Sequence, residues 1–419
     1  MSSPSPLPEY RGDVRMRGFA VRSTVEDAWS WIDTTVQSRT ALDCESVELL
    51  EAAGRVLTET VVSQFSVPAF SRSMMDGYAV RSEDTYGASP ASPLPLRIIG
   101  SSFPGRPAAE TVRGGTAVRI MTGAPVPNGA DAVLPVEFTT TENELVQISG
   151  EVSPGKNIGI PGEDIRKNES VLNAGRWLRP QDVGLLSAIG RKTVTVRRRP
   201  RIRILVSGNE ILPPGNLPTD FRIPDSNGPM LKALAERDGA CVTLSDIIPD
   251  DPAQLLAELQ CGVDVVLVSG GSSVGQEDHI PVLLRTHGEL AIHGIAMRPS
   301  SPAGMGRIGR SLVFLLPGNP VSCLCAYDFF AGRAIRMMGG RKPEWTYHRV
   351  SAPLKRKLVS TVGRVDYARV RFENQEVEPI AISGASVLSS TTRADGFVVI
   401  PADSEGYAAG TSVDVYCYE

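Results

Sequence analysis

The stretch that decides the fold reads Asp264-Val-Val-Leu-Val268, then Ser269-Gly-Gly-Ser-Ser-Val-Gly275, then Gln276-Glu-Asp278-His279. Its first part is an unbroken apolar run, typical of a strand that is buried on both faces of a parallel sheet. Its second part holds three glycines and three serines in seven positions, so its backbone N–H groups and hydroxyls could hold an oxyanion. A plain structural turn explains the same residues equally well. The loop marks where a ligand would lie, at the carboxyl edge of a sheet.

Strands and helices alternate on both sides of this stretch, from Pro200 to Gly340. The expected strands cover residues 202–206, 241–244, 265–268 and 312–316, and the expected helices cover residues 229–237, 252–260 and 321–338. Alternation of this kind predicts a mostly parallel sheet with helices on both faces. We therefore expect a three-layer α/β domain over residues 199–342.

The remaining sequence predicts a multidomain chain of α/β plus β class. Residues 1–20 are expected to form a flexible tail. Many Pro and Gly residues separate short β-prone pieces between residues 63 and 162, which predicts an inserted β-domain. This insert would interrupt an N-terminal segmented domain made of residues 21–62 and 163–198. Residues 343–419 predict a small C-terminal β-barrel or sandwich.

One helix is expected on each side of the insert. Ser23-Thr-Val-Glu26 has the spacing of a capping box and opens a helix that carries Trp29 and Trp31. The second helix covers residues 179–190, with a proline near its start and a glycine at its end.

Composition excludes several classes of protein. A length of 419 residues, with 42% hydrophobic and 21% charged residues, is typical of a soluble protein with several domains. The net charge of −4 argues against a broad nucleic-acid surface. The six cysteines include no Cys-x-x-Cys pair, which argues against a disulfide framework or a zinc site. No window approaches the ~20 apolar residues of a membrane span, so we expect no membrane partner and a cytoplasmic location.

Three polar turns follow expected strands of the α/β domain: Ser207-Gly-Asn-Glu210, Ser269 to Gly275, and Pro317-Gly-Asn-Pro320. If these strands are parallel neighbours, the turns line one crevice that could hold a phosphorylated ligand. Glu210, Asp278 and the Asp250-Asp251 pair could face this crevice, and hard carboxylate oxygens suit Mg²⁺. The alternative role of Asp250-Asp251 is to cap the helix that begins at the following proline.

Two strings in the insert also stand out, Ser73-Met-Met-Asp76-Gly-Tyr-Ala-Val80 and Arg119-Ile-Met-Thr122-Gly-Ala-Pro125. Hairpin turns explain their glycines. Hairpin turns do not explain why Asp76 and Thr122 stand in otherwise apolar surroundings.

Eight strings taken in order carry a resemblance to a known family. They are Met75-Asp-Gly-Tyr-Ala-Val80, Arg119-Ile-Met-Thr-Gly-Ala-Pro125, Gly162-Glu-Asp-Ile-Arg166, Leu178-Arg-Pro-Gln-Asp-Val-Gly-Leu-Leu186, Ser207-Gly-Asn-Glu210, Asp225-Ser-Asn227, Ser269-Gly-Gly-Ser-Ser-Val-Gly275 and Leu316-Pro-Gly-Asn-Pro-Val-Ser322. Together they resemble the molybdopterin molybdotransferase family, the MoeA type that includes the E domain of gephyrin. The match runs from about residue 20 to residue 419 in the family's order.

The resemblance implies an elongated protomer with four parts: an N-terminal segmented domain, an inserted β-domain, a pterin-binding α/β domain and a C-terminal β-barrel. It also implies a homodimer in which the insert of one subunit helps to complete the crevice of the other. The implied reaction takes adenylylated molybdopterin from an upstream adenylyltransferase, together with molybdate. It uses Mg²⁺ and releases molybdenum cofactor and AMP.

The family's functional residues can be carried over by motif. The implied catalytic residues are Asp76, Thr122, Asp164, Glu210, Asp250 and Asp278, of which Glu210, Asp250 and Asp278 would hold the metal. The implied substrate-binding residues are Ser207, Gly208, Gly270, Gly271, Ser272, Ser273, Gly275, Arg298, Ser301, Pro317, Gly318, Asn319 and Pro320.

One string departs from the family pattern. Where the family usually has Lys-Pro-Gly-Lys-Pro, this chain reads Arg298-Pro-Ser-Ser-Pro302. Ser301 therefore replaces a lysine, and a planar guanidinium orients hydrogen bonds differently from an ammonium group. If that lysine helps to hold molybdate, affinity for the oxyanion should be lower here, or another cation must substitute. A pterin-binding scaffold that inserts metal poorly, and an enzyme that inserts tungstate, are the alternatives.

Overall fold

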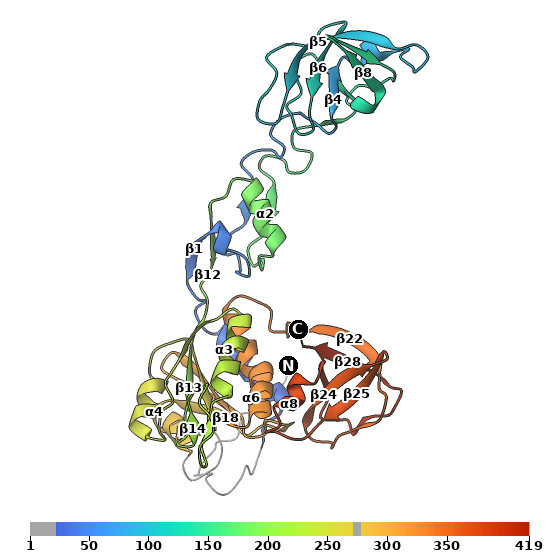
Figure 1. Cartoon of the computed structure of the whole chain (residues 1–419). Coiled ribbons are helices and arrows are strands. Elements are labelled where there is room, and N and C mark those ends of the chain that lie inside the picture. Colours follow the sequence, from blue (N-terminus) through green and yellow to red (C-terminus); the bar gives the residue numbers. More distant parts are fainter. Residues whose placement is uncertain (1–21, 271–277, 419) are drawn as a thin grey trace, which may run out of the picture. The chain divides into compact units, whose positions relative to one another are not determined.

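The computed structural model describes residues 22–270 and 278–418, which divide into two compact units (Figure 1). Unit 1 holds residues 22–45, 54–56, 196–270 and 278–418. Unit 2 holds residues 46–53 and 57–195. Strands β1 (Cys44–Glu48) and β12 (Thr193–Arg197) form a two-stranded sheet and carry the chain from one unit to the other. Within the described residues, no helix has both the length and the apolar character of a membrane span.

The centre of unit 1 is a mixed six-stranded sheet. Its order is β16 (Cys241–Leu244), β13 (Arg201–Val206), β17 (Val265–Ser269), β21 (Ser311–Leu316), β20 (Gly304–Ile308), β18 (Glu289–His293). The first four strands are parallel neighbours, which confirms the four predicted strands. The two antiparallel strands, β20 and the edge strand β18, were not predicted. Gly306 breaks the apolar pattern of β20, but a Cβ there would lie 2.0 Å from the Glu289 carbonyl oxygen, so this strand pair requires a glycine.

Helices pack on both faces of this sheet (Figure 1). Helices α3 (Asn227–Arg237), α6 (Pro320–Ala326) and α7 (Gly332–Met338) share a core with Ile204, Leu267 and Phe314. Helices α4 (Pro252–Leu259) and α5 (Ile280–His287) share another core with Leu205 and Val268. Successive strand residues therefore face opposite cores, which explains why β17 is continuously apolar.

The expected helix over residues 321–338 is not continuous. A π-helical turn over Tyr327–Ala331 (η4) separates α6 from α7. In this wider turn, successive side chains point into different surroundings. Phe329 and Phe330 enter the apolar core, whereas Asp328 enters a polar network described below.

Helix α1 (Val25–Gln37) packs on unit 1, whereas the sequence predicted it in the N-terminal segmented domain. The ring of Trp29 stacks on Phe329 of the π-helical turn, with centroids 6.1 Å apart. The capping box is formed by Thr24 and Asp27, one residue later than predicted. Thr24 Oγ1 accepts from the Asp27 N–H at 3.0 Å, and the Asp27 carboxylate accepts from the Thr24 N–H at 3.1 Å.

Unit 2 contains the predicted β-insert. Its six-stranded sheet has the order β7 (Ala132–Pro135), β4 (Gly77–Val80), β6 (Thr116–Ile120), β5 (Leu94–Ser102), β9 (Leu145–Ile148), β8 (Thr139–Glu142). Two small antiparallel pairs lie outside this sheet, β2 (Val61–Val62) with β11 (Ser170–Leu172) and β3 (Arg72–Ser73) with β10 (Ile158–Gly159). The remaining elements are helix α2 (Pro180–Ala188) and the short turns η1 (Leu49–Glu51), η2 (Ser82–Thr85) and η3 (Val136–Phe138). Helix α2 confirms the helix predicted over residues 179–190, and the strands over residues 94–102, 116–120 and 132–135 agree with the β-rich character predicted between residues 63 and 162.

The C-terminal strands form a second sheet of unit 1. Its order is β19 (Met297–Arg298), β24 (Val365–Glu373), β26 (Gly396–Ile400), β28 (Ser412–Cys417), β22 (His348–Pro353), and β25 (Glu376–Ala381) pairs with β24. Strands β23 (Leu358–Val359) and β27 (Gly406–Tyr407) form a small pair, and α8 (Ser389–Thr392) is a short helix. Because β19 comes from the α/β part of the chain, the two sheets of unit 1 are joined at Arg298.

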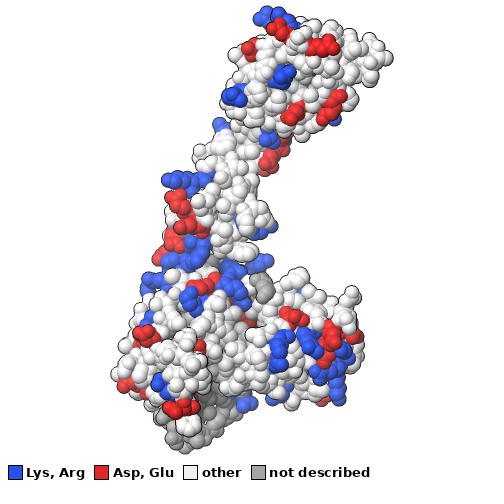
Figure 2. Space-filling view, viewed as in Figure 1, with Lys and Arg blue, Asp and Glu red and all other residues white. Residues whose placement is uncertain are grey.

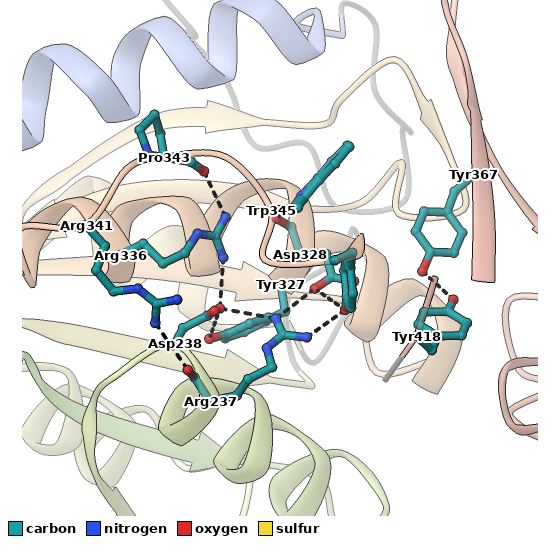
Figure 3. A network of polar contacts seen from close by, with 11 residues as sticks. Arg237, Asp238, Tyr327, Asp328, Arg336, Arg341, Pro343, Trp345, Tyr367 and Tyr418 are labelled. Atoms are coloured by element: carbon teal, nitrogen blue, oxygen red, sulfur yellow. Dashed lines mark hydrogen bonds and ion pairs between the residues drawn. The ribbon is translucent and has the colours of Figure 1, made fainter. Parts of the chain in front are cut away.

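A buried network of charges links α3, the π-helical turn, α7 and the segment that leads to β22 (Figure 3). Asp238 Oδ2 accepts from the Tyr327 hydroxyl at 3.0 Å and from Arg336 Nη1 at 2.9 Å. Asp328 accepts from the Tyr347 hydroxyl at 3.0 Å. Both carboxylates are fully buried, and burial raises the pKa of Asp328 to about 6. Removing one partner of such a network leaves a charge without compensation.

We predict that Arg336→Gln destabilises unit 1 by about 3 kcal/mol, because Asp238 would keep its buried charge and lose its closest guanidinium. Lys232→Gln is the matched control, since Lys232 and Glu236 form an exposed pair of the kind worth less than about 1 kcal/mol. Urea unfolding followed by tryptophan fluorescence measures both. Equal small losses would contradict the importance of the network.

Candidate functional site

Three turns start level at the carboxyl edge of the parallel strands. In the ladder, Val206 of β13 lies opposite Ser269 of β17, and Ser269 lies opposite Leu316 of β21. The next residues along the chain are Ser207, Gly270 and Pro317. The structure therefore brings the starts of the three predicted turns to one edge of one sheet, and residues 271–275 of the second turn lie outside the described residues.

Asn227 ties two of these turns together. Its Nδ2 donates to Ser269 Oγ at 2.9 Å and to the Gly318 carbonyl at 2.7 Å. Asn227 is the first residue of α3, where Asp225 Oδ1 accepts from the N–H groups of Asn227 and Gly228. Asn227 was not among the predicted site residues, although Asp225-Ser-Asn227 is one of the strings that carry the resemblance.

Buried polar atoms without a partner lie at the same edge. Among residues 22–270 and 278–418, Ser207 Oγ, Ser245 Oγ and Asn227 Oδ1 are buried and have no hydrogen-bond partner. Buried polar groups in folded proteins are rarely left unpaired. Their clustering identifies this edge as a place that suits a polar ligand.

Two glycines fix the shape of the first two turns. Gly270 has φ +94°, and a Cβ there would lie 2.3 Å from the Ser207 carbonyl oxygen. Only glycine permits this approach between the turns of β13 and β17. At Gly208 a Cβ would lie 2.8 Å from Glu210 Oε2, so the exposed carboxylate of Glu210 folds back over its own turn.

A cavity of about 580 Å³ opens beside the ends of β13 and β16. Its lining combines polar groups from Gly208, Asp225 and Asp246 with apolar walls that include Ile211 and Leu244. A planar heterocycle with polar edges suits a lining of this kind.

A second cavity of about 770 Å³ lies beside the end of β21, between the two sheets of unit 1. The predicted residues Arg298, Ser301, Pro317 and Asn319 line it, together with Arg22 and Arg364, which the sequence did not single out.

Two arginines of this second cavity share one acidic partner, Asp366, which is fully buried. Arg298 forms a close ion pair with Asp366, and Arg364 Nε lies 3.3 Å from the same carboxylate. Among the described residues, Arg298 Nε and Ser301 Oγ are buried without a hydrogen-bond partner. Three arginines against one carboxylate leave the lining cationic, which favours an oxyanion.

The other predicted residues of unit 1 have different outcomes. Gly271, Ser272, Ser273 and Gly275 lie outside the described residues. Asp250 is half-buried and follows β16, and the neighbouring Asp251 caps α4 by accepting from the Gln254 N–H at 2.9 Å. Asp278 precedes α5, whose first turn holds a proline. Pro320 is the first residue of α6.

Metal binding by Glu210, Asp250 and Asp278 stays a prediction. In the described part of the chain, no group of three or more His, Cys, Asp or Glu residues is arranged to hold a metal ion. Mg²⁺ does not require such a group, because it is usually bound by one or two carboxylates together with substrate phosphates. The exposed carboxylate of Glu210 beside the turn of β13 fits that requirement.

In unit 2 the structure brings Asp76 and Thr122 together. Asp76 Oδ1 accepts from both the N–H and the hydroxyl of Thr122, each at 2.7 Å. These two hydrogen bonds lower the pKa of Asp76, with the N–H as the larger cause. Asp164 lies on the segment that pairs with Val67, where its N–H donates to the Val67 carbonyl at 3.1 Å.

We predict that Thr122→Val raises the pKa of Asp76 toward its ordinary value, because one hydrogen bond to the ionised form is lost. The pair contributes stability above the unfolded pKa of Asp76, and this contribution is lost as the pH falls through the lower folded pKa. Carboxyl ¹³C titration by NMR measures the shift, and Thr122→Ser is the control that keeps the hydroxyl. An unchanged pKa in Thr122→Val would contradict the assignment.

Comparison with known proteins agrees with this geometry. Three family models match: the MoeA N-terminal region (domain I and II) over residues 23–190, the probable molybdopterin binding domain over residues 203–336, and the MoeA C-terminal region (domain IV) over residues 351–418. Molybdopterin molybdenumtransferase 2 of Mycobacterium tuberculosis is 35% identical, over 88% of this chain and 94% of that protein. Molybdopterin molybdenumtransferase of Haemophilus influenzae is 32% identical, over 88% of this chain and 93% of that protein.

A solved structure shows the same relationship. The crystal structure of the molybdopterin biosynthesis MoeA protein from Pyrococcus horikoshii is 31% identical, with a TM-score of 0.78, and covers 95% of this chain and 100% of that chain. Matched by models along most of its length and by relatives more than 30% identical, the chain belongs to the MoeA family.

Proposed function

We propose that this chain takes part in molybdenum cofactor biosynthesis as a molybdopterin molybdenumtransferase, with adenylylated molybdopterin and molybdate as substrates and molybdenum cofactor and AMP as products. The observation that carries the proposal is that a cavity suited to a heterocycle and a cationic cavity open at the same sheet edge. Asn227, which hydrogen-bonds to Ser269 and Gly318, joins the turns that follow β17 and β21 at this edge.

The pterin is assigned to the 580 Å³ cavity beside β13 and β16. A pterin ring presents N–H donors, and the carboxylates of Asp225 and Asp246 can accept hydrogen bonds from them. Ile211 and Leu244 would contact the faces of the ring. Backbone N–H groups that follow Gly208 in the first turn, and those of the Gly270 turn, would hold the phosphate, since glycine permits a close approach. The N–H groups of Ser207 and Gly208 themselves donate to the Ser269 and Ile248 carbonyls. These groups bind and orient the substrate before any bond is broken.

Molybdate is assigned to the cationic cavity that Arg298, Arg364 and Ser301 line. Guanidinium groups match tetrahedral oxyanions through paired N–H donors. Arg22 and Arg364 lie in the same cavity as Ser301, so they can supply the charge that the family's second lysine would otherwise supply. Asp366 keeps Arg298 and Arg364 oriented.

Mg²⁺ is assigned to Glu210 and Asp278, with Asp250 in support. When bound, the ion supplies Lewis-acid stabilisation of the charge that develops on the leaving phosphate. Glu210 holds its carboxylate over the turn of β13, beside the place assigned to the substrate phosphate. A homodimer is part of this proposal, in which Asp76, Thr122 and Asp164 of the insert complete the site of the other subunit.

The second candidate is a pterin-binding scaffold that inserts metal poorly, and the serine at position 301 favours it. Incubation with adenylylated molybdopterin, molybdate and Mg²⁺ separates the two. Release of AMP together with cofactor formation supports the enzyme, and tight binding of the pterin without AMP release supports the scaffold. Replacement of molybdate by tungstate in the same assay tests the tungstate alternative.

We predict that Ser301→Lys lowers the molybdate concentration needed for half-maximal rate by about tenfold, because one added charge-assisted contact is worth about 1.5 kcal/mol. Ser301→Ala is the matched control, since it removes the hydroxyl and adds no charge. An unchanged molybdate dependence in Ser301→Lys would show that the oxyanion is held elsewhere.

A further inference from the structure

A cavity of about 770 Å³ lies at the amino edge of the central sheet, opposite the candidate site. Residues that precede three parallel strands line it: Arg198 before β13, Asp264 before β17 and Arg310 before β21. The five residues of β17 separate the two edges by about 16 Å at ~3.3 Å per residue. Other parts of the lining come from the end of α1 and the end of α7.

Arginine dominates this lining, and we refer to it as the arginine cavity. Its charged residues are six arginines, Arg39, Arg197, Arg198, Arg307, Arg310 and Arg341, and two aspartates, Asp43 and Asp264. Asp264 is already occupied, because its oxygens accept from Arg198 at 2.8 and 3.1 Å and from the Arg201 N–H at 2.7 Å. Arg307 pairs with Glu289 at 2.5 Å.

Main-chain carbonyls, and not carboxylates, hold three of the other arginines in place. Arg39 Nη2 donates to the Arg310 carbonyl at 2.5 Å. Arg197 Nη1 donates to the Leu42 carbonyl at 2.8 Å, and Arg310 Nε donates to the Gly262 carbonyl at 2.7 Å. A carbonyl fixes the orientation of a guanidinium and leaves its charge uncompensated.

The pKa shifts agree with this arrangement. Burial lowers the pKa of Arg39, and the charge of Arg307 lowers it further, against the opposing effect of Asp264. Burial likewise lowers the pKa of Arg341. Among the described arginines with a clearly shifted pKa, Arg39 and Arg341 have a lowered pKa and the others have a raised one. Both Arg39 and Arg341 line the arginine cavity. A bound anion would oppose this shift, because a nearby negative charge favours the charged form of arginine.

The uncharged part of the lining is largely apolar, with Val36, Leu42, Met337, Met338 and Pro343. A cavity of this size that combines guanidinium groups with apolar walls suits an anion with an apolar body. We propose that the arginine cavity binds a phosphorylated small molecule, with the phosphate on Arg39, Arg197 and Arg310 and an aromatic or aliphatic body on Leu42 and Met338. This site is separate from the one assigned to the pterin.

ADP is the probe for this proposal, because it joins two phosphates to a planar base. Titration calorimetry of ADP into the full chain should show binding that weakens as salt is raised. Arg39→Gln should weaken it about tenfold, and Arg39→Lys should retain most of the affinity. Inorganic pyrophosphate should bind more weakly than ADP, since it lacks the apolar body.

Gln37 offers a pair of opposite changes within the same cavity. It is exposed at the end of α1 and lines the cavity, so its replacement leaves the core intact. Gln37→Lys should tighten ADP binding, and Gln37→Glu should weaken it, each by several-fold. Arg371→Gln is the control, because Arg371 lies on the C-terminal strands, where Figure 2 shows basic and acidic side chains side by side.

The outcomes either support or overturn the proposal. Opposite responses of Gln37→Lys and Gln37→Glu, together with an unchanged affinity in Arg371→Gln, support it. Affinity that is unchanged in all Arg39 and Gln37 variants places ADP elsewhere and overturns it. A change in sedimentation of the Arg39 variants without any ADP binding would show that the cavity is a subunit contact, which also overturns it. Failure of the AMP-release assay leaves this test intact, because the Arg39 and Gln37 variants change residues at the opposite edge of the sheet only.

Discussion

The level alignment of β13, β17 and β21 is the constraint on which the functional part of this chain depends. Because Val206, Ser269 and Leu316 lie in one row of the ladder, the three turns that follow begin at one height. Gly270 then brings the first two turns into contact, and Asn227 joins the second to the third. A slip of one residue in any of these strands would turn its side chains to the other face and separate the turns.

The sequence predicted those features that depend on local pattern. Continuous apolar runs identified the parallel strands, since burial on both faces leaves no polar positions, and Gly-bearing polar turns identified the strand ends. Strand β20 could not be found this way, because its glycines at positions 304 and 306 serve close contacts with β18 and interrupt the apolar pattern. The packing of α1 on unit 1 also depends on a partner, Phe329, that lies 300 residues along the chain.

The sequence alone also could not show which charged residues from distant segments meet in one cavity. Ser301 and Arg298 were visible as a departure from the family pattern, but Arg22 and Arg364 enter the same cavity from distant segments. The arginine cavity is likewise assembled from residues between positions 36 and 343. Single arginines in a sequence give no sign of whether a carboxylate or a carbonyl will hold them. That difference decides whether a pocket is neutral or attracts an anion.

Strand β19 has a further consequence. Its two residues belong to the α/β part of the chain but pair with β24 of the C-terminal sheet, and Arg298 of β19 meets Asp366 of β24. The cationic cavity is thus lined by residues from both the α/β part and the C-terminal sheet of unit 1. The residues that line the 580 Å³ cavity all precede α7 in the chain, whereas Arg364 and Asp366 follow it. Under the proposed assignment, the heterocycle is therefore recognised by residues of the α/β part alone, whereas the inorganic anion needs residues from both parts.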